Sequence, residues 1–209
     1  MPVRRVVSGA AGEIACTAGA AYDDLIQRLV PAWKNDGRTG LTRPLAARLA
    51  VAVDLAAGGA DKVWLVPVPS RPESLVRRGF SPPHLLAREL ARRSGRSRPL
   101  LAVGAVVAPG GVGDQIGLGR LDRQRNLDHT MRAGDRALVE QLRAAWRRGT
   151  SILLVDDVVT TGATLAETAR ALSAAGVPVS SAVLVADTPP GRRPRPFRSL
   201  PLTDVGHTV

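Results

Sequence analysis

The residues whose types and spacing are best suited to binding or catalysis lie in one stretch, Ile152–Thr164, which reads ILLVDDVVTTGAT. Its four consecutive apolar residues, Ile152–Val155, have the length and branching of a strand that is buried on both faces. Two carboxylates, Asp156 and Asp157, follow at once, and the chain then becomes small and hydroxylated at Thr160–Thr164. A helical pattern begins directly afterwards. The order is therefore a buried strand, an acidic pair, a Thr/Gly turn and a helix N-terminus.

This order predicts a site for a ligand that carries both a phosphate and a ribose. In a parallel sheet the ligand crevice lies beyond the carboxyl ends of the strands, and a helix N-terminus offers N–H groups and a partial positive charge to a phosphate. Gly162 lets the backbone approach closely, and neighbouring threonine hydroxyls add hydrogen bonds. The two carboxylates would repel a phosphate, so vicinal sugar hydroxyls or a magnesium ion held through water suit them better.

Position by position, the stretch resembles the phosphoribosyl-pyrophosphate (PRPP) binding motif of type I phosphoribosyltransferases. The resemblance implies an α/β fold with a parallel twisted sheet flanked by helices, and Mg²⁺ as cofactor. It implies that the ribose hydroxyls contact Asp156 and Asp157, which would also reach Mg²⁺ through water while the ligand holds most of the metal. The implied binding residues for the 5′-phosphate are Thr160, Thr161, Gly162, Ala163 and Thr164. The alternative is an ordinary strand–turn–helix corner with a solvated acidic pair.

A second stretch, Val66–Phe80 (VPVPSRPESLVRRGF), leaves a predicted strand with two prolines and then presents a serine and three arginines. Guanidinium groups match phosphate oxygens bidentately, so this composition favours a diphosphate. The segments VPVP, RRGF and LLAREL together resemble the ComF family, cytosolic phosphoribosyltransferase-like proteins associated in some bacteria with DNA uptake. The resemblance implies a pyrophosphate-binding loop formed by Pro67, Val68, Pro69, Ser70 and Arg71. An edge turn with solvated arginines is the alternative.

The chain departs from the ComF pattern directly after this stretch. Relatives usually continue Gly-Phe-Asn-Gln, whereas this chain has Gly79, Phe80, Ser81 and Pro82. We expect Ser81 to form hydrogen bonds and to cap the helix that follows, but a proline cannot replace a glutamine amide. His84 lies at the start of that helix and is interpreted as a solvated surface histidine.

A third stretch, Pro109–Asn126 (PGGVGDQIGLGRLDRQRN), is rich in glycine and shows no apolar period, which predicts a mobile lid. Its residues resemble a ComF motif of glutamine, glycine-leucine, arginines and asparagine. The resemblance implies that the segment folds over the diphosphate, with Arg123 and Arg125 as catalytic candidates beside the aspartates. The other lid residues implied in this way are Gln115, Gly117, Arg120 and Asn126. A basic surface loop is the alternative.

The remaining patterns predict how these stretches are positioned. From residue 61 to residue 188, strands alternate with helices, which indicates a parallel sheet with right-handed crossovers. The strands expected beside Ile152–Val155 are Val63–Val68, Leu100–Val107 and Val179–Val185. A helix capped by Asp135 is expected before the central strand.

The two ends of the chain are expected to differ from this core. Residues 1–60 are expected to form a small N-terminal cap over the crevice, with strands at Arg4–Val7 and Glu13–Thr17 and a first helix that ends at Pro31. A second helix, from Leu41 to Ala56, should end at two glycines. Residues 189–209 are rich in proline and arginine, and we expect a poorly ordered basic tail.

Composition narrows the class of protein further. The net charge of +11 favours polyanionic partners, which include phosphorylated small molecules and nucleic acid. Cys16 is the one cysteine, which excludes an intrachain disulfide and the four-cysteine zinc ribbon that many ComF relatives carry. No apolar run approaches the length of a membrane span, and we expect a cytoplasmic protein. A homodimer and nucleic-acid binding through the basic surface both remain open.

The function expected from the resemblance is PRPP binding, with transfer of a phosphoribosyl group to an unknown nucleophile and release of diphosphate. Two alternatives remain, because a PRPP pocket serves catalysis and sensing equally well. One is a non-enzymatic ComF-type competence factor in DNA uptake or processing, and the other is a regulator that senses PRPP. The sequence does not reveal the acceptor.

Overall fold

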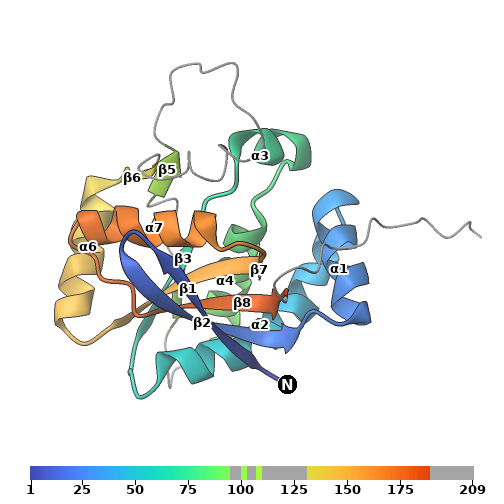
Figure 1. The fold of residues 1–209 in the computed structure, drawn as a ribbon, viewed down its shortest axis with the longest axis horizontal. Coiled ribbons are helices and arrows are strands. Elements are labelled where there is room, and N and C mark those ends of the chain that lie inside the picture. Colours follow the sequence, from blue (N-terminus) through green and yellow to red (C-terminus); the bar gives the residue numbers. More distant parts are fainter. Residues whose placement is uncertain (95–99, 103–106, 110–130, 189–209) are drawn as a thin grey trace, which may run out of the picture.

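A single six-stranded sheet forms the centre of the molecule (Figure 1). The structure, a computed structural model, describes residues 1–94, 100–102, 107–109 and 131–188. The strands lie in the order β1-β2-β8-β7-β3-β4, and every pair of neighbours is parallel except β1 and β2. This mostly parallel sheet flanked by helices confirms the predicted α/β class.

The elements have the following bounds. The strands are β1 Val3–Gly9, β2 Gly12–Ala21, β3 Val63–Pro67, β4 Leu100–Ala102, β5 Val107–Pro109, β6 Met131–Ala133, β7 Ser151–Val159 and β8 Ser181–Asp187. The α-helices are α1 Asp24–Asn35, α2 Thr42–Ala57, α3 Pro72–Arg78, α4 Pro82–Arg93, α6 Arg136–Arg147 and α7 Ala163–Ala174, and a short 3₁₀ helix spans Thr39–Leu41.

Two hydrophobic cores lie on opposite faces of the sheet. On one face α6 and α7 pack against alternate residues of β7, which include Ile152 and Leu154. On the other face α1, α2 and α4 pack against Leu153 and Val155. All four of these β7 residues are buried, so the apolar run is a strand covered on both sides, as its sequence predicts.

Local signals explain why the helices begin where they do. Asp135 accepts a hydrogen bond from the backbone N–H of Leu138 at 3.0 Å, and this contact is the predicted N-cap of α6. Asp23 caps α1 in the same way through Ile26, at 2.9 Å. The second predicted helix corresponds to α2, which Gly58 follows with a positive φ of 55°.

The N-terminal residues join the central sheet. The two predicted strands pair with each other as an antiparallel hairpin, and β2 then runs parallel to β8. A Cβ atom at Gly19 of β2 would lie 2.3 Å from the carbonyl oxygen of Arg48, so α2 lies directly against this strand. Strands from residues 1–60 and from residues 61–188 therefore share one sheet.

Three boundary predictions are wrong. The first helix does not end at Pro31 but continues to Asn35, because Trp33 lies in the same buried row as Ile26 and Val30. The expected strand at Leu100–Val107 forms parts of two different sheets, since β4 pairs with β3 whereas β5 pairs with β6. The central strand does not end at Val155, as discussed below for the site.

Candidate functional site

The sheet has a topological switch point between β3 and β7. From β3 the chain continues to β4 on one side, and the next strand of the sheet, β7, lies on the other side of β3. Ligands of open parallel sheets bind at such points, beyond the carboxyl ends of the strands. The first two sequence stretches singled out above include the carboxyl ends of these two strands and the turns that follow them. The fold therefore brings them to one edge.

A cleft of about 170 Å³ lies at this edge. Side chains from α1, α3, α4, the end of β7 and the start of α7 contribute to its walls. The residues that line it are Lys34, Val68, Pro69, Ser70, Arg71, Ser74, Arg78, Pro82, Pro83, Asp156, Asp157 and Thr164. Both carboxylates and most of the expected pyrophosphate loop thus face one space.

The acidic pair lies within β7 and not after it. The strand runs through Asp156 and Asp157 to Val159, and its pairing with β8 continues to Asp187. Successive side chains of a strand point to opposite faces, so the two carboxylates have different surroundings. The sequence predicted a break after Val155 because carboxylates are rare inside strands, but continued pairing with β8 supports the extended backbone here.

Asp157 is 4% exposed and forms an ion pair with Lys34 of α1. Its Oδ1 atom also accepts a hydrogen bond from the backbone N–H of Val158 at 2.6 Å. A buried carboxylate requires such partners, because an unpaired charge in the interior is costly. The carboxylate of Asp157 is therefore held by Lys34 of α1 and by a backbone N–H group of its own strand.

Asp156 accepts a hydrogen bond from the backbone N–H of Asp157 at 2.8 Å through its Oδ1 atom. Burial raises the pKa of Asp156, and the negative charge of Asp157 raises it further, whereas the ammonium of Lys34 acts in the opposite direction. The raised pKa means that Asp156 holds a proton which a free aspartate would release. A ligand that brings hydroxyl donors or a cation would favour release of that proton and the ionised form of both carboxyls.

Lys34 is a site residue that the sequence analysis missed. It lies one turn beyond Pro31, where the first helix was expected to have ended. The adjacent Trp33 fixes this last turn: its Nε1–H donates to Thr42 Oγ1 at 2.9 Å, and its ring lies 6.4 Å from that of Phe80. No motif marks Lys34, and an apolar row that continues past the proline is the one signal that could have indicated helix there.

The Thr/Gly turn leads into α7, as predicted. Gly162 has a φ of +81°, and a Cβ atom there would lie 2.5 Å from a methyl carbon of Val7 on β1. Glycine is therefore required for two reasons: the backbone is left-handed, and no space is left for a Cβ atom. Of the five residues expected to bind the 5′-phosphate, Thr164 lines the cleft, and Thr160 and Thr161 are exposed beside it.

The expected pyrophosphate loop is tied to the acidic strand. The backbone N–H of Val68 donates to the carbonyl oxygen of Val155 at 2.9 Å, which continues the pairing of β3 with β7. Four of the five predicted loop residues, 68–71, line the cleft, whereas Pro67 is the last residue of β3. The loop therefore begins one residue later than predicted from the sequence.

A short helix, α3, follows this loop and was not predicted, since its seven residues are too few to show a period. It carries Arg78 into the wall of the cleft. The Nε–H of Arg78 is buried and has no hydrogen-bond partner among the described residues. A buried guanidinium donor without an acceptor is unusual in a folded protein, and an anion in the cleft would supply one.

Two expectations about the next turn are corrected. Ser81 precedes α4 but its side chain does not cap the helix; its hydroxyl lies 3.0 Å from that of Ser70. His84 is half-buried and not a solvated surface residue, and its Nδ1 atom lies 3.3 Å from Ser81 Oγ. Burial lowers the pKa of His84, and the neighbouring charge of Arg88 lowers it further.

The lid candidates lie outside the described residues. They are Gln115, Gly117, Arg120, Arg123, Arg125 and Asn126. The same holds for the C-terminal tail from residue 189. The described part of the cleft is formed by residues of the first two sequence stretches together with Lys34, Pro82 and Pro83.

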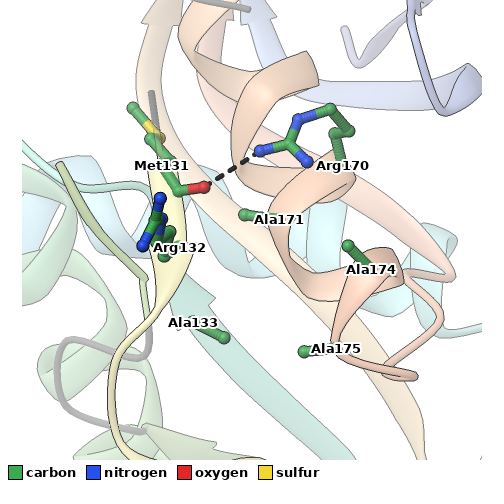
Figure 2. Close-up of a pocket in the computed structure, with 7 residues that line it drawn as sticks. All are labelled: Met131, Arg132, Ala133, Arg170, Ala171, Ala174 and Ala175. Carbon is green, nitrogen blue, oxygen red and sulfur yellow. Dashed lines mark hydrogen bonds between the residues drawn. The ribbon is translucent and has the colours of Figure 1, made fainter. Parts of the chain in front are cut away.

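A larger cavity of about 370 Å³ lies between β6 and the second half of α7 (Figure 2). Alanines form much of its wall, and Figure 2 shows the guanidinium of Arg170 turned toward Met131. Arg170 donates to the carbonyl oxygen of Met131 at 2.9 Å and forms an ion pair with Glu167 at 2.6 Å. None of the described residues that line this cavity carries a carboxylate. The smaller cleft at the end of β7 has the chemistry that a sugar phosphate requires.

The described residues show neither a metal-binding cluster nor a membrane-spanning helix. No group of three or more His, Cys, Asp or Glu side chains gathers there in a way that could hold a metal ion. No helix in that part of the chain combines the length and the apolar character needed to cross a membrane.

Comparison with known proteins agrees with the geometry. The family described as phosphoribosyl transferase domain matches residues 86–199, which is more than half of the 209-residue chain. The matched region includes β7, the acidic pair and α7. A comparison with curated proteins found no match. The chain belongs to the phosphoribosyl transferase domain family, whose general function is phosphoribosyl transfer with PRPP as substrate.

Proposed function

We propose that the protein binds Mg²⁺–PRPP in the cleft between the ends of β3 and β7 and transfers the phosphoribosyl group to a nucleophile, with release of diphosphate. The observation that carries this proposal is the convergence of three groups on one cleft. These groups are the acidic pair, the first turn of α7 and the loop after β3. Each group suits a different part of PRPP, so the order of groups around the cleft supports one orientation of the ligand.

In this orientation the 5′-phosphate binds at residues 160–164. The first N–H groups of a helix have no partner within the helix, and they favour an anion. Gly162 brings the backbone close, and threonine hydroxyls can donate to phosphate oxygens. The ribose hydroxyls then donate to the carboxylate oxygens of Asp156 and Asp157, which favours the ionised form of both groups.

The diphosphate lies against the loop after β3 in this proposal. Ser70 and Arg71 supply hydrogen-bond donors from the loop, and Arg78 adds its unpartnered Nε–H from α3. Arginine binds phosphate oxygens through several parallel N–H groups. The cations therefore gather on the side of the cleft where the leaving group would develop negative charge.

Mg²⁺ fits this arrangement as a companion of the ligand. It prefers oxygen ligands and keeps several waters, so phosphate and hydroxyl oxygens of PRPP would hold most of it. Asp156 and Asp157 would contact it through water. When bound, the ion would neutralise charge on the diphosphate.

The reaction breaks the bond between the anomeric carbon of the ribose and a diphosphate oxygen, which leaves with the electron pair. The acceptor forms the new bond to that carbon and loses a proton. The carbon is cation-like in between, so the protein contributes by stabilising the leaving group and by excluding water. No protein nucleophile is needed. Arg123 and Arg125 of the expected lid remain catalytic candidates on the sequence resemblance alone.

The test is a calorimetric titration of PRPP with and without Mg²⁺, followed by an assay of diphosphate release. Binding that depends on Mg²⁺, with release that continues on addition of an acceptor, supports the proposal. Binding without any turnover would favour the PRPP-sensing or competence-factor alternatives. Absence of PRPP binding would contradict the proposed site. The next measurement would then be DNA affinity at several salt concentrations, because the nucleic-acid alternative predicts an affinity that falls steeply with salt.

A further inference from the structure

Three hydrogen-bonding side chains form a row that leads from the cleft to α4. The hydroxyl oxygens of Ser70 and Ser81 lie 3.0 Å apart, and His84 Nδ1 lies 3.3 Å from Ser81 Oγ. Ser70 lines the cleft, whereas the other two lie behind it. Neither Ser81 nor His84 has a role in the function proposed above.

Ser81 occupies the position of an N-cap residue without acting as one. An N-cap serine normally accepts a hydrogen bond from the N–H of the second or third residue of its helix. The first two residues of α4 are Pro82 and Pro83, which have no N–H. Pro83 thus removes one of the two donors that a cap would satisfy. The Ser81 hydroxyl bridges Ser70 and His84 instead.

The direction of hydrogen-bond donation along this row decides whether the Ser70 hydroxyl can donate its proton into the cleft. A hydroxyl has one proton to donate and two lone pairs. If Ser70 donates to Ser81, it presents lone pairs to the cleft and repels a phosphate oxygen. If Ser81 donates to Ser70, the Ser70 proton is free to point into the cleft. Ser81 then needs a donor behind it, and His84 Nδ1 is the atom within reach.

His84 can supply that donor as a neutral ring. It is half-buried, and Arg88 is a positively charged neighbour, so its pKa is lowered and the imidazole is neutral near pH 7. A neutral imidazole carries its proton on one of its two ring nitrogens. The hydrogen bonds made by the two nitrogens decide which of them is protonated. With the proton on Nδ1, the order of donation runs from His84 to Ser81, then to Ser70 and into the cleft.

We propose that Ser81 and His84 are positioning residues that direct the hydroxyl proton of Ser70 into the cleft, where it is donated to a diphosphate oxygen. The proposal deepens the function proposed above and rests on it. Ser70 is then the binding residue, and the other two act through it.

The test is a double-mutant cycle on the affinity of the full-length protein for inorganic diphosphate, measured by calorimetry with Mg²⁺. Ser81→Ala, His84→Ala and Ser70→Ala should each weaken diphosphate binding about fivefold, as expected for the loss of one net hydrogen bond. In the Ser70→Ala background, Ser81→Ala should cause no further loss, because its effect passes through Ser70. Ser81→Thr and His84→Asn should keep most of the wild-type affinity, since each substitution keeps a hydrogen-bond donor at the required place.

Ser173→Ala, on the exposed side of α7, is the control and should leave diphosphate affinity unchanged. Additive losses in the double variant would overturn the proposal, because they would show that Ser81 acts independently of Ser70. Equal affinity of wild-type and Ser81→Ala protein would overturn it as well, while leaving the proposed function intact. Wild-type protein that binds neither PRPP nor diphosphate would contradict the proposed function and this inference together.

Discussion

Lys34 of α1 forms an ion pair with Asp157 of β7, two residues that lie 123 positions apart in the chain. The aspartate is buried and the lysine side chain is 22% exposed. The contact joins the N-terminal helices to the strand that carries the acidic pair. It also places a cation at the edge of the cleft where an anionic ligand is expected.

Removal of this lysine should affect both stability and binding. Lys34→Ala leaves the buried Asp157 carboxylate without its cation, and we expect the free energy of unfolding to fall by about 2 kcal/mol, less than for a fully buried pair. PRPP affinity should fall as well. Lys62→Ala, an exposed lysine before β3, is the matched control and should change urea-induced unfolding by less than about 0.5 kcal/mol. Equal effects of the two substitutions would contradict the role of the ion pair.

Arg78 and Arg77 are neighbours on α3 with different surroundings. Arg78 lines the cleft with an unpartnered Nε–H, whereas Arg77 is exposed. Arg78→Ala should weaken diphosphate binding about tenfold, since a charged hydrogen bond is lost. It should not lower the free energy of unfolding, because the Nε–H has no partner to lose. Arg77→Ala should change diphosphate affinity little, and a larger effect of Arg77 would contradict the assignment.

The raised pKa of Asp156 predicts how stability depends on pH. From the usual value of 3.8 up to the raised pKa, the folded protein keeps a proton that the unfolded chain has released. Stability therefore falls as the pH rises through this window. Asp156→Asn should remove that fall and stabilise the ligand-free protein at pH 8 by at least about 1.4 kcal/mol, the equivalent of one pKa unit.

The measurement is urea unfolding of both proteins at several pH values, so that the difference isolates this carboxyl. Asp61→Asn changes an exposed aspartate and should give a curve parallel to wild type. An Asp156→Asn curve that is parallel to wild type would show that Asp156 is ionised as easily in the folded protein as in the unfolded chain.

Gly162 and Gly149 share a φ of +81° but differ in the space around them. A Cβ atom at Gly149 would meet nothing within 4 Å, whereas at Gly162 it would collide with Val7. Gly149→Ala should therefore cost about 1 kcal/mol of backbone strain. Gly162→Ala should cost about 1–3 kcal/mol more through overpacking. Val7→Ala in the same chain should recover part of that extra cost, and no recovery would exclude the collision as its cause.

The sequence predicted the parts of the site that are local in the chain. A strand buried on both faces and a glycine before a helix each leave a pattern within a few residues, and Ile152–Val155 and Gly162 lie where the motif places them, although the strand continues through the acidic pair to Val159. The Asp135 cap of α6 was predictable for the same reason. These features depend on neighbouring residues and not on the tertiary fold.

The sequence could not predict what tertiary contacts decide. The helix α1 passes through Pro31 because the packing of Trp33 offsets the cost of a proline, about 3 kcal/mol. Lys34 reaches the cleft as a result. The orphan donor of Arg78 and the contact between Ser70 and Ser81 likewise depend on how α3 and α4 pack, which no pattern in Val66–Phe80 reveals.

The central claim is that PRPP binds at the acidic pair of β7. The most direct test is calorimetric titration of PRPP with Mg²⁺ into the wild-type protein and into the Asp156→Asn, Asp157→Asn double variant. Arg132→Ala, in the cavity between β6 and α7, serves as the control. The account predicts binding to the wild type and to the control, and loss of at least about 100-fold in affinity in the double variant, as expected when two charged hydrogen-bond acceptors are removed. Unchanged affinity in a folded double variant, or loss of binding in Arg132→Ala, would contradict it.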